Sequence, residues 1–333
     1  MDKNTLTGFI LIGLVLLGFS WWNRPTQEQI EARQHYYDSI QNAQLMQQAE
    51  LEAKQAELNK PIFEETDSDS IKMAKASYTL GDFAQGALGS EEIVTLENEV
   101  VKIDFSTKGA LVESVILKDY LNYKKETLTL FEKGDNWFSI ELPTRSNRML
   151  QTADMNFRVG AKTDSSVVFT LPIEGGRSLD FIYVLHPNDY MVDFDVKANG
   201  LSEVLQPVDA LKSYWKYKVR QQEKGRKFEN RYSQIYYYLT DDEDYEYLSE
   251  TSSETEEVNE KIRWIAYKDQ FFSAVLIADN SVKSATISSE LEPDKSEYLK
   301  AYSSTIMLPY EGGNSQMDLR LFFGPNKYSL LKD

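Results

Sequence analysis

Two patterns of hydrophobic residues divide the chain. Residues 6–22 form one uninterrupted apolar run, LTGFILIGLVLLGFSWW, whereas short β-branched and aromatic runs that alternate with polar residues begin near residue 91. As a helix, the 17 residues of the first run would span about 26 Å, just short of the ~30 Å hydrocarbon core of a bilayer. Alternation with a period of two is typical of strands that have one solvated face. The patterns therefore predict a membrane-spanning helix within residues 1–23 and a β-domain at residues 91–333.

The apolar run is predicted to be an uncleaved signal anchor, because no small-x-small cleavage site follows it. Lys3 and the α-amino group outweigh Asp2 in charge, so the positive-inside rule places the N-terminus inside and the remaining chain outside. The two tryptophans at the end of the run suit the headgroup level of a bilayer. The side chains expected to anchor the chain in lipid are Leu6, Phe9, Ile10, Leu14, Leu17, Trp21 and Trp22.

Residues 24–60 are rich in Gln, Glu and Ala and are predicted to form a polar helical stalk. One heptad position is mostly apolar, but the position four residues on holds glutamines, so only half of a coiled-coil seam is present. A solvated stalk and a weakly self-associating helix both fit this pattern. Residues 61–90 contain an acidic, serine-rich run and three glycines, and they are predicted to be a linker or a lead-in to the next domain. The apolar heptad residues are Ile30, Tyr37, Leu51 and Leu58.

About fifteen strand-like runs follow one another between residues 91 and 333, separated by turn signals such as Lys108-Gly109 and Asn199-Gly200. Val100–Phe105 and Ala110–Leu117 are two clear examples. Strands do not alternate with helices along this region, which disfavours a parallel α/β sheet. The expected fold is mainly β: a large antiparallel sandwich.

Two charged stretches interrupt this rhythm. Residues 241–260 hold ten acidic residues and no basic one, whereas residues 212–231 are strongly basic. One interpretation is a solvated hairpin and loop whose opposite charges lie next to each other. The other is a docking surface, in which the basic hairpin binds an acidic partner or lipid headgroups. The basic residues are Lys212, Lys216, Lys218, Arg220, Lys224, Arg226, Lys227 and Arg231.

The composition removes several functional classes. The net charge of −17 disfavours binding to nucleic-acid phosphates. The absence of cysteine excludes disulfides, thiol nucleophiles, zinc–thiolate sites and a lipoprotein anchor. No phosphate-binding glycine motif or zinc-binding histidine motif is present, and the two histidines, His35 and His186, cannot complete a triad. We therefore expect no cofactor, no metal and no enzymatic activity.

A carbohydrate-binding or carbohydrate-modifying sandwich is the alternative, because sandwich domains of this size are common in carbohydrate enzymes. A mutarotase-type site would be expected to supply histidines, and the predicted β-domain contains only His186. A mechanism that uses a pair of carboxylates stays open, since acidic residues are plentiful.

Three further segments carry a family resemblance. The first is the opening MDKNT, followed by the apolar run and the polar stretch behind it. The second is NEVVKIDFSTKGALVESVILKDY at residues 98–120, in which a strand, a glycine turn and a strand ending in LKDY follow one another. The third is WIAYKDQFFSAVLI at residues 264–277 with LFFGPN at residues 321–326. In this order and spacing they resemble the YidC membrane protein insertase family, in particular its Bacteroidetes members.

The resemblance implies an insertase and chaperone that helps inner-membrane proteins insert and fold, alone or with the Sec translocon. Its partners would be Sec components and nascent membrane proteins, with the N-terminus in the cytoplasm and the bulk of the chain in the periplasm. It also implies a β-supersandwich at residues 91–333 that ends in a short helix near Asn326–Lys332. In the family, five further transmembrane helices carry insertion through a hydrophilic groove, and none precedes Asp333. We therefore expect the N-terminal part of such a protein, without insertion activity of its own.

Three roles for the β-domain follow from these observations. It is a periplasmic binding and scaffold module, a carbohydrate-directed sandwich, or a spacer that keeps the anchor and the insertase core apart.

Overall fold

The structure is a computed structural model in which residues 67–326 are described. The chain divides into two compact units, Met1–Pro61 and Ile62–Asp333, and the described residues belong to the second. The predicted anchor with its seven lipid-facing side chains, the stalk and the C-terminal helix lie outside the described residues. Between residues 67 and 326 no helix is both long and apolar enough to cross a membrane.

Two helical elements open the described part of the chain, within the segment predicted as a linker or lead-in. Helix α3 spans Asp69–Leu80 and the 3-10 helix η1 spans Gly81–Ala87. The chain changes direction at Gly81, whose φ of 60° is a conformation that glycine adopts readily. Phe83 of η1 is fully buried and belongs to the hydrophobic core, so η1 packs against the β-domain.

The described residues contain nineteen strands in three sheets, and every pairing between these strands is antiparallel. The four-stranded sheet has the order β1 (Ile93–Glu97), β2 (Val101–Ser106), β3 (Leu111–Leu121), β4 (Thr127–Phe131). The six-stranded sheet has the order β14 (Glu254–Val258), β17 (Ala285–Leu291), β18 (Tyr298–Pro309), β11 (Ala210–Arg220), β5 (Asn136–Pro143), β6 (Met149–Gln151).

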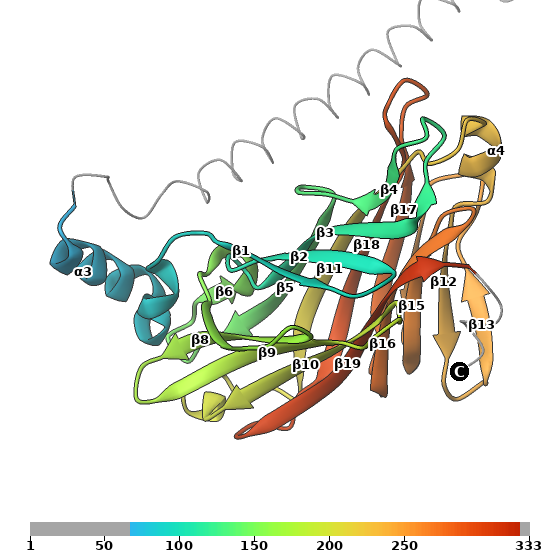
Figure 1. Cartoon of the computed structure of the whole chain (residues 1–333). Helices are drawn as coiled ribbons and strands as arrows, with labels where there is room; N and C mark the ends of the chain where they lie inside the picture. Colours follow the sequence, from blue (N-terminus) through green and yellow to red (C-terminus); the bar gives the residue numbers. More distant parts are fainter. Residues whose placement is uncertain (1–66, 327–333) are drawn as a thin grey trace, which may run out of the picture. The chain divides into compact units, whose positions relative to one another are not determined.

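The nine-stranded sheet has the order β13 (Asp244–Tyr247), β12 (Gln234–Leu239), β15 (Ile262–Lys268), β16 (Phe272–Val282), β19 (Ser315–Pro325), β10 (Met191–Asn199), β9 (Arg177–Leu185), β8 (Ser166–Ile173), β7 (Arg158–Lys162). Three short helices, η2 (Thr152–Asp154), η3 (Leu201–Glu203) and α4 (Arg226–Arg231), lie between strands. Figure 1 shows the nine-stranded sheet running beneath the other two. The sequence-based expectation of a mainly antiparallel β-fold is confirmed.

Aromatic rings connect the inner faces of the sheets. Between the six-stranded and nine-stranded sheets, the rings of Trp215 and Tyr267 stack with their centroids 3.9 Å apart. Between the four-stranded and nine-stranded sheets, the ring centroids of Phe105 and Tyr183 lie 4.6 Å apart, and Tyr183 also stacks on Phe194. Each such pair is worth about 0.5–1.5 kcal/mol beyond its buried area. These contacts make the three sheets one sandwich with a continuous core.

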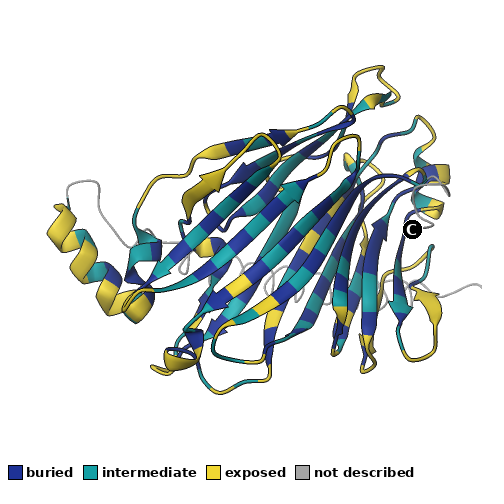
Figure 2. Ribbon diagram, turned by 60° about the horizontal axis from the view of Figure 1, so that its bottom comes forward, coloured by how far each residue is buried: buried dark blue, intermediate teal, exposed yellow. Residues whose placement is uncertain are grey.

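Strand β11 positions the predicted basic residues. It lies inside the six-stranded sheet, paired with β18 on one side and β5 on the other. Its apolar positions, such as Trp215 and Val219, are buried, whereas Lys212, Lys216 and Lys218 are exposed. The alternation of buried and less buried positions is visible along the strands in Figure 2. Because side chains of a strand alternate between its two faces, these lysines share the outer face of the sheet.

The predicted basic hairpin at residues 212–231 is wrong. Strand β11 pairs with β5 and β18, and after residues 221–225 the chain forms the short helix α4 instead of a returning strand. The acidic stretch lies partly on β13 and partly on β14, and two strands separate β14 from β11. Among the ion pairs of the described residues, a single one, Arg231–Glu250 at 3.6 Å, joins the two stretches. Mutual neutralisation therefore does not account for most of the basic residues.

Candidate docking surface on the six-stranded sheet

Two lysines of β11 lie over aromatic rings on the outer face of the sheet. The ammonium of Lys216 is 5.0 Å from the ring centroid of Trp137, which is its paired residue on β5. The ammonium of Lys218 is 5.2 Å from the ring centroid of Tyr298. Exposed cation–π contacts of this kind contribute about 0.5–1 kcal/mol. The rings restrict the ammonium groups in position and leave their N–H donors available to a bound anion.

Hydroxyl groups extend this surface across the neighbouring strands. Lys216 pairs with Ser303 of β18, which pairs with Ser288 of β17. Ser288 in turn shares a hydrogen bond of 2.7 Å with Thr255 of β14. The surface therefore runs from cations on β11 through hydroxyls to the acidic edge strand β14. Charged side chains on an edge strand discourage pairing with foreign strands, so β14 is protected while the centre of the sheet stays open to a partner.

Lys212 is less available than the other two lysines of the strand. Its ammonium lies 4.0 Å from a carboxylate oxygen of Glu141, which also accepts hydrogen bonds from Tyr214 at 2.9 Å and from Gln151 at 3.1 Å. Burial, followed by the hydrogen bond to Glu141, raises the pKa of Tyr214 to about 12. This end of the strand is thus a neutralised polar cluster.

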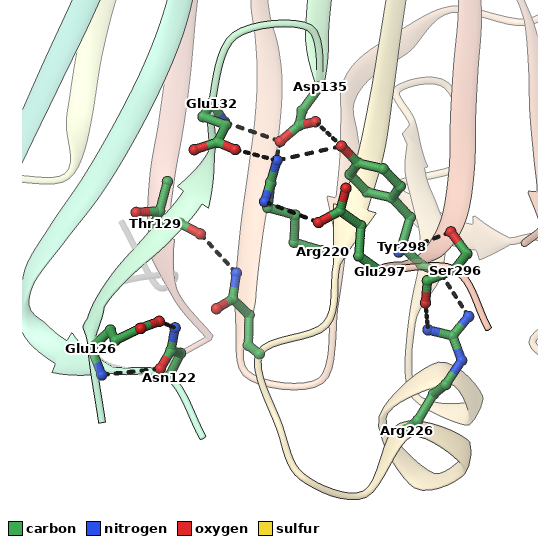
Figure 3. Close-up of polar contacts among 11 residues, drawn as sticks. Asn122, Glu126, Thr129, Glu132, Asp135, Arg220, Arg226, Ser296, Glu297 and Tyr298 are labelled. Carbon is green, nitrogen blue, oxygen red and sulfur yellow. Dashed lines mark hydrogen bonds and ion pairs between the residues drawn. The ribbon is translucent and has the colours of Figure 1, made fainter. Parts of the chain in front are cut away.

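Arg220 is the centre of an ion-pair network and is not available to a partner (Figure 3). Its guanidinium donates to Glu132 at 2.6 Å and to Asp135, and it lies 3.8 Å from Glu297. Tyr298 donates its hydroxyl to the other oxygen of Asp135 at 2.7 Å. The Asp135 side chain is only 1% exposed, so the arginine compensates a buried carboxylate. Arg220 is a positioning residue that also holds the ring of Tyr298 beneath Lys218.

A polar cavity of about 260 Å³ opens beside Arg220. Its walls come from the turn between β3 and β4, from the end of β11 and from Glu297. Gln222 spans one side, where its side-chain amide donates to the carbonyl of Thr129 at 2.8 Å. Asn122 and Glu126 also line the cavity, and their side chains bond to each other at 3.1 Å across the turn (Figure 3). The polar groups on these walls are therefore largely paired with one another.

The basic residues after β11 divide into structural and exposed ones. Arg226 of α4 donates to the carbonyls of Pro293, Ser296 and Tyr298 at 2.6–2.9 Å, which ties the helix to the turn before β18. Lys224 and Lys227 are exposed, and no carboxylate lies within ion-pairing distance of either among the described residues.

The buried carboxylate of Glu229, a residue of α4, connects this helix to the loop that precedes it. It is 1% exposed and accepts the backbone N–H groups of Gln222 at 2.7 Å and Glu223 at 3.1 Å. Burial raises its pKa to about 8 in spite of these two bonds. The loop between β11 and α4 is thus fixed by a buried carboxyl group.

The structure therefore separates the eight predicted residues. Lys216 and Lys218 lie together on the sheet face, and Lys224 and Lys227 lie at the end of the domain. The other four are engaged within the fold: Lys212 with Glu141, Arg220 with Glu132 and Asp135, Arg226 with backbone carbonyls, and Arg231 with Glu250. The sequence reasoning missed Trp137 and Tyr298, whose rings support the two strand lysines. Both aromatic residues lie within residues 91–333, the predicted β-domain, but the sequence alone does not give the register that places them next to β11.

His186, the one histidine among the described residues, lies in the connection between β9 and β10 of the nine-stranded sheet. Its side chain is half exposed, and its Nε2 atom is 2.8 Å from a carboxylate oxygen of Asp193. In the described part of the chain, no three His, Cys, Asp or Glu side chains are grouped so that they could hold a metal ion.

Together these features define an antiparallel β-sandwich domain with a cationic and aromatic face. Residues 93–333 match the model of the YidC periplasmic domain family, and the chain belongs to this family. This confirms the resemblance seen in the sequence.

The curated relatives are longer than this chain. The membrane protein insertase YidC of Parabacteroides distasonis is 40% identical in an alignment that covers 100% of this chain and 53% of the relative. The protein of the same name from Bacteroides fragilis is 36% identical, with 99% of this chain and 52% of the relative covered. The chain therefore spans about half the length of the curated relatives it matches.

Two solved structures are weakly similar. A galactose mutarotase-like protein from Lactobacillus casei is 14% identical, with 70% of this chain and 100% of that chain covered and a TM-score of 0.45. A putative aldose 1-epimerase from Escherichia coli K12 is 10% identical, with 70% and 99% covered and a TM-score of 0.42. No functional conclusion follows from similarities of this size.

Proposed function

We propose that this chain is the N-terminal part of a membrane protein insertase, anchored in the inner membrane by residues 6–22. In this proposal the β-domain is a periplasmic binding and scaffold module, which positions the insertase near the Sec translocon or holds nascent membrane proteins. The names of the relatives and the family of residues 93–333 support the insertase assignment. The observation that carries the binding role is the open cationic face formed by Lys216 over Trp137 and Lys218 over Tyr298.

The geometry of this face favours an acidic protein partner. Lys216 and Lys218 are two residues apart on one strand face, a separation of roughly 7 Å that matches carboxylates on alternate residues of an extended segment. Complementary charges of this kind speed association and set the orientation of a complex more than they raise its affinity. A weak, oriented contact suits a module that must release its partner.

We assign no catalytic role to the domain. The charged groups of the face are lysines held over aromatic rings, and its acids are engaged in structural ion pairs such as those of Asp135 with Arg220. General acid–base catalysis would need a positioned acid and base whose pKa values suit proton transfer to a substrate.

Site-specific cross-linking tests the proposal. A photoreactive residue would replace Lys216 or Lys218 in the chain expressed in its membrane, and the matched control would replace Lys197, an exposed lysine of β10 on the nine-stranded sheet. We expect Sec components or nascent membrane proteins to be captured from positions 216 and 218 and not from position 197. Recovery of the same abundant neighbours from all three positions would contradict the proposal.

A glycan array probed with the purified chain tests the carbohydrate alternative. The insertase proposal predicts no saturable signal. Saturable binding to one glycan, with turnover of that glycan, would replace the scaffold role by a carbohydrate-directed one.

A further inference from the structure

Four segments far apart in the sequence meet at one end of the domain. They are the β3–β4 turn, helix α4 with the loop before it, the residues between β15 and β16, and the β17–β18 turn. Tyr123 of the first donates its backbone N–H to the carbonyl of Gln222 at 2.8 Å, and Lys268 donates to the carbonyl of Tyr232 at 3.1 Å. Arg226 connects α4 to the β17–β18 turn through the carbonyl of Pro293. Figure 1 shows α4 and the two turns at the same end.

Several large hydrophobic side chains are exposed to solvent at this end of the domain. Six of the fourteen large hydrophobic residues that are exposed in the described part of the chain belong to these segments or to the strand ends that border them. The rings of Phe228 and Tyr232 contact each other, with centroids 4.7 Å apart, at the outer side of α4. The six residues, with their exposed fractions, are Leu121 (61%), Tyr123 (42%), Phe228 (57%), Tyr232 (43%), Phe271 (49%) and Leu291 (41%).

Lysines flank these hydrophobic side chains. The sequence at the first tip is Tyr123-Lys124-Lys125, and at the second tip Lys224 and Lys227 precede Phe228. All four lysines are exposed. The acidic residues nearest to them in sequence are Glu126, whose carboxylate bonds to Asn122, the half-buried Glu223, and the buried Glu229. Each of the two tips therefore combines exposed apolar groups with more exposed lysines than exposed acidic residues, whereas the β17–β18 turn at the same end carries Glu292, Asp294 and Glu297 against Lys295.

Buried polar groups fix both tips in place. Glu229 accepts the backbone N–H groups of Gln222 and Glu223, and Gln222 donates to the β4 backbone. Asp269 is 5% exposed and accepts the backbone N–H groups of Phe271 and Phe272 at 2.8 and 2.7 Å. The backbone that carries the exposed apolar side chains is thus held in place by buried hydrogen bonds.

We infer that this end of the domain contacts the membrane surface, with Tyr123, Phe228 and Tyr232 at the headgroup level and the four lysines paired with anionic phospholipid headgroups. The inference rests on the proposed membrane anchor and adds a second point of attachment. Aromatic rings favour the interfacial region, and lysines near an anionic membrane surface are attracted to it. Two separate tips that each carry aromatic rings and lysines suit a headgroup layer better than they suit a protein interface, whose core is continuous and apolar.

The absence of cysteine allows a direct test in the full chain. Single variants Tyr123→Cys and Phe228→Cys would carry a fluorophore, and the chain would be reconstituted in phosphatidylcholine vesicles with and without phosphatidylglycerol. Nitroxide-labelled lipid reports contact by quenching. Val159→Cys on the exposed edge strand β7 is the control for the domain, and Trp22→Cys reports whether the anchor is inserted.

We expect quenching at positions 123 and 228 to exceed that at position 159 by about threefold in vesicles that contain phosphatidylglycerol. Replacing the four lysines by glutamine should remove most of the excess without changing the melting temperature. Quenching at position 22 but equal, low quenching at 123, 228 and 159 would overturn the membrane contact while leaving the anchor intact. Absence of quenching at position 22 as well would overturn the proposed anchor together with this contact.

Discussion

The basic stretch of residues 212–231 consists of two halves that differ in structure although they have the same charge. In the strand half, Lys216 and Lys218 lie on a flat face over aromatic rings contributed by other strands. In the loop half, Lys224 and Lys227 lie on a tip next to Phe228. Each half also contains an arginine whose donors are engaged in hydrogen bonds within the domain, Arg220 in the strand half and Arg226 in the loop half. A count of charges in a sequence therefore overstates the charge that a partner can reach, and the supporting side chains determine which kind of partner each half suits.

The largest difference is expected between a structural and an exposed cation of the strand half. Arg220→Ala leaves the buried carboxylate of Asp135 without its counter-ion and should lower the free energy of unfolding by about 3 kcal/mol. Lys218→Ala, two residues away on the same face, should change it by less than about 0.5 kcal/mol. Urea denaturation of both variants measures this. Equal effects would show that Arg220 is a surface residue like its neighbour.

The loop half and the neighbouring turn between β15 and β16 should depend on pH, because Glu229 supports the first and Asp269 the second. Burial raises the pKa of Asp269 to about 7 and that of Glu229 to about 8. A raised carboxyl pKa means that the folded state binds more protons than the unfolded state. The resulting stability is complete below about pH 4 and is lost as the pH rises through 7 and 8, at about 1.4 kcal/mol per pH unit for each proton.

Asp269→Asn keeps the oxygen that accepts the N–H groups of Phe271 and Phe272 but cannot ionise. It should therefore reduce the slope of unfolding free energy against pH by one proton between pH 5 and 6.5, and leave the variant more stable than the parent chain at pH 8. Burial lowers the pKa of Lys300 to about 8. Above that pH the unfolded state therefore binds more protons at this lysine than the folded state, so Lys300 makes the free energy of unfolding rise with pH. An unchanged slope below pH 7 would contradict the assignment.

A smaller effect is expected for the exposed lysines of the strand half. With the photoreactive residue at position 303 of β18, next to Lys216, the double variant Lys216→Gln and Lys218→Gln should reduce cross-linking to an acidic partner by about fivefold, which corresponds to about 1 kcal/mol. The matched pair Lys224→Gln with Lys227→Gln should leave this yield unchanged. Equal losses from both pairs would mean that the two halves form one electrostatic surface.

The smallest effect is expected for the ring that supports Lys216. Trp137→Ala removes the cation–π contact and should reduce the cross-linking yield from position 218 by about twofold, because the contact is worth about 0.5 kcal/mol at an exposed site. Trp137→Phe keeps an aromatic face and should retain most of the yield. An alanine variant that cross-links as well as the parent chain would show that the Trp137 ring does not contribute to the docking surface.

The sequence predicts the parts of this account that depend on local periodicity. Alternation along β11 places Lys212, Lys216 and Lys218 on one face, and the antiparallel sheets follow from many short alternating runs. The pairing partners of β11 are β5 and β18, which are distant in the sequence. The rings beneath the lysines and the ion pairs of Arg220 therefore could not be predicted from the sequence around β11.

The predicted hairpin is wrong for the same physical reason. A strand followed by a polar turn suggests that the chain returns alongside itself, but in the structure the backbone of β11 is already paired on both sides. The residues that follow therefore have no free edge to join, and they form α4, which Glu229 holds from below.

The central claim is that the two halves of the basic stretch have different partners, and one measurement tests it most directly. Cross-linking from position 218 and lipid quenching at position 228 would be recorded in the same reconstituted chain, with either Lys216→Gln or the pair Lys224→Gln and Lys227→Gln. We predict that the first change reduces only the protein cross-link and the second reduces only the lipid contact. A result in which each change reduces both signals to the same extent would contradict the account.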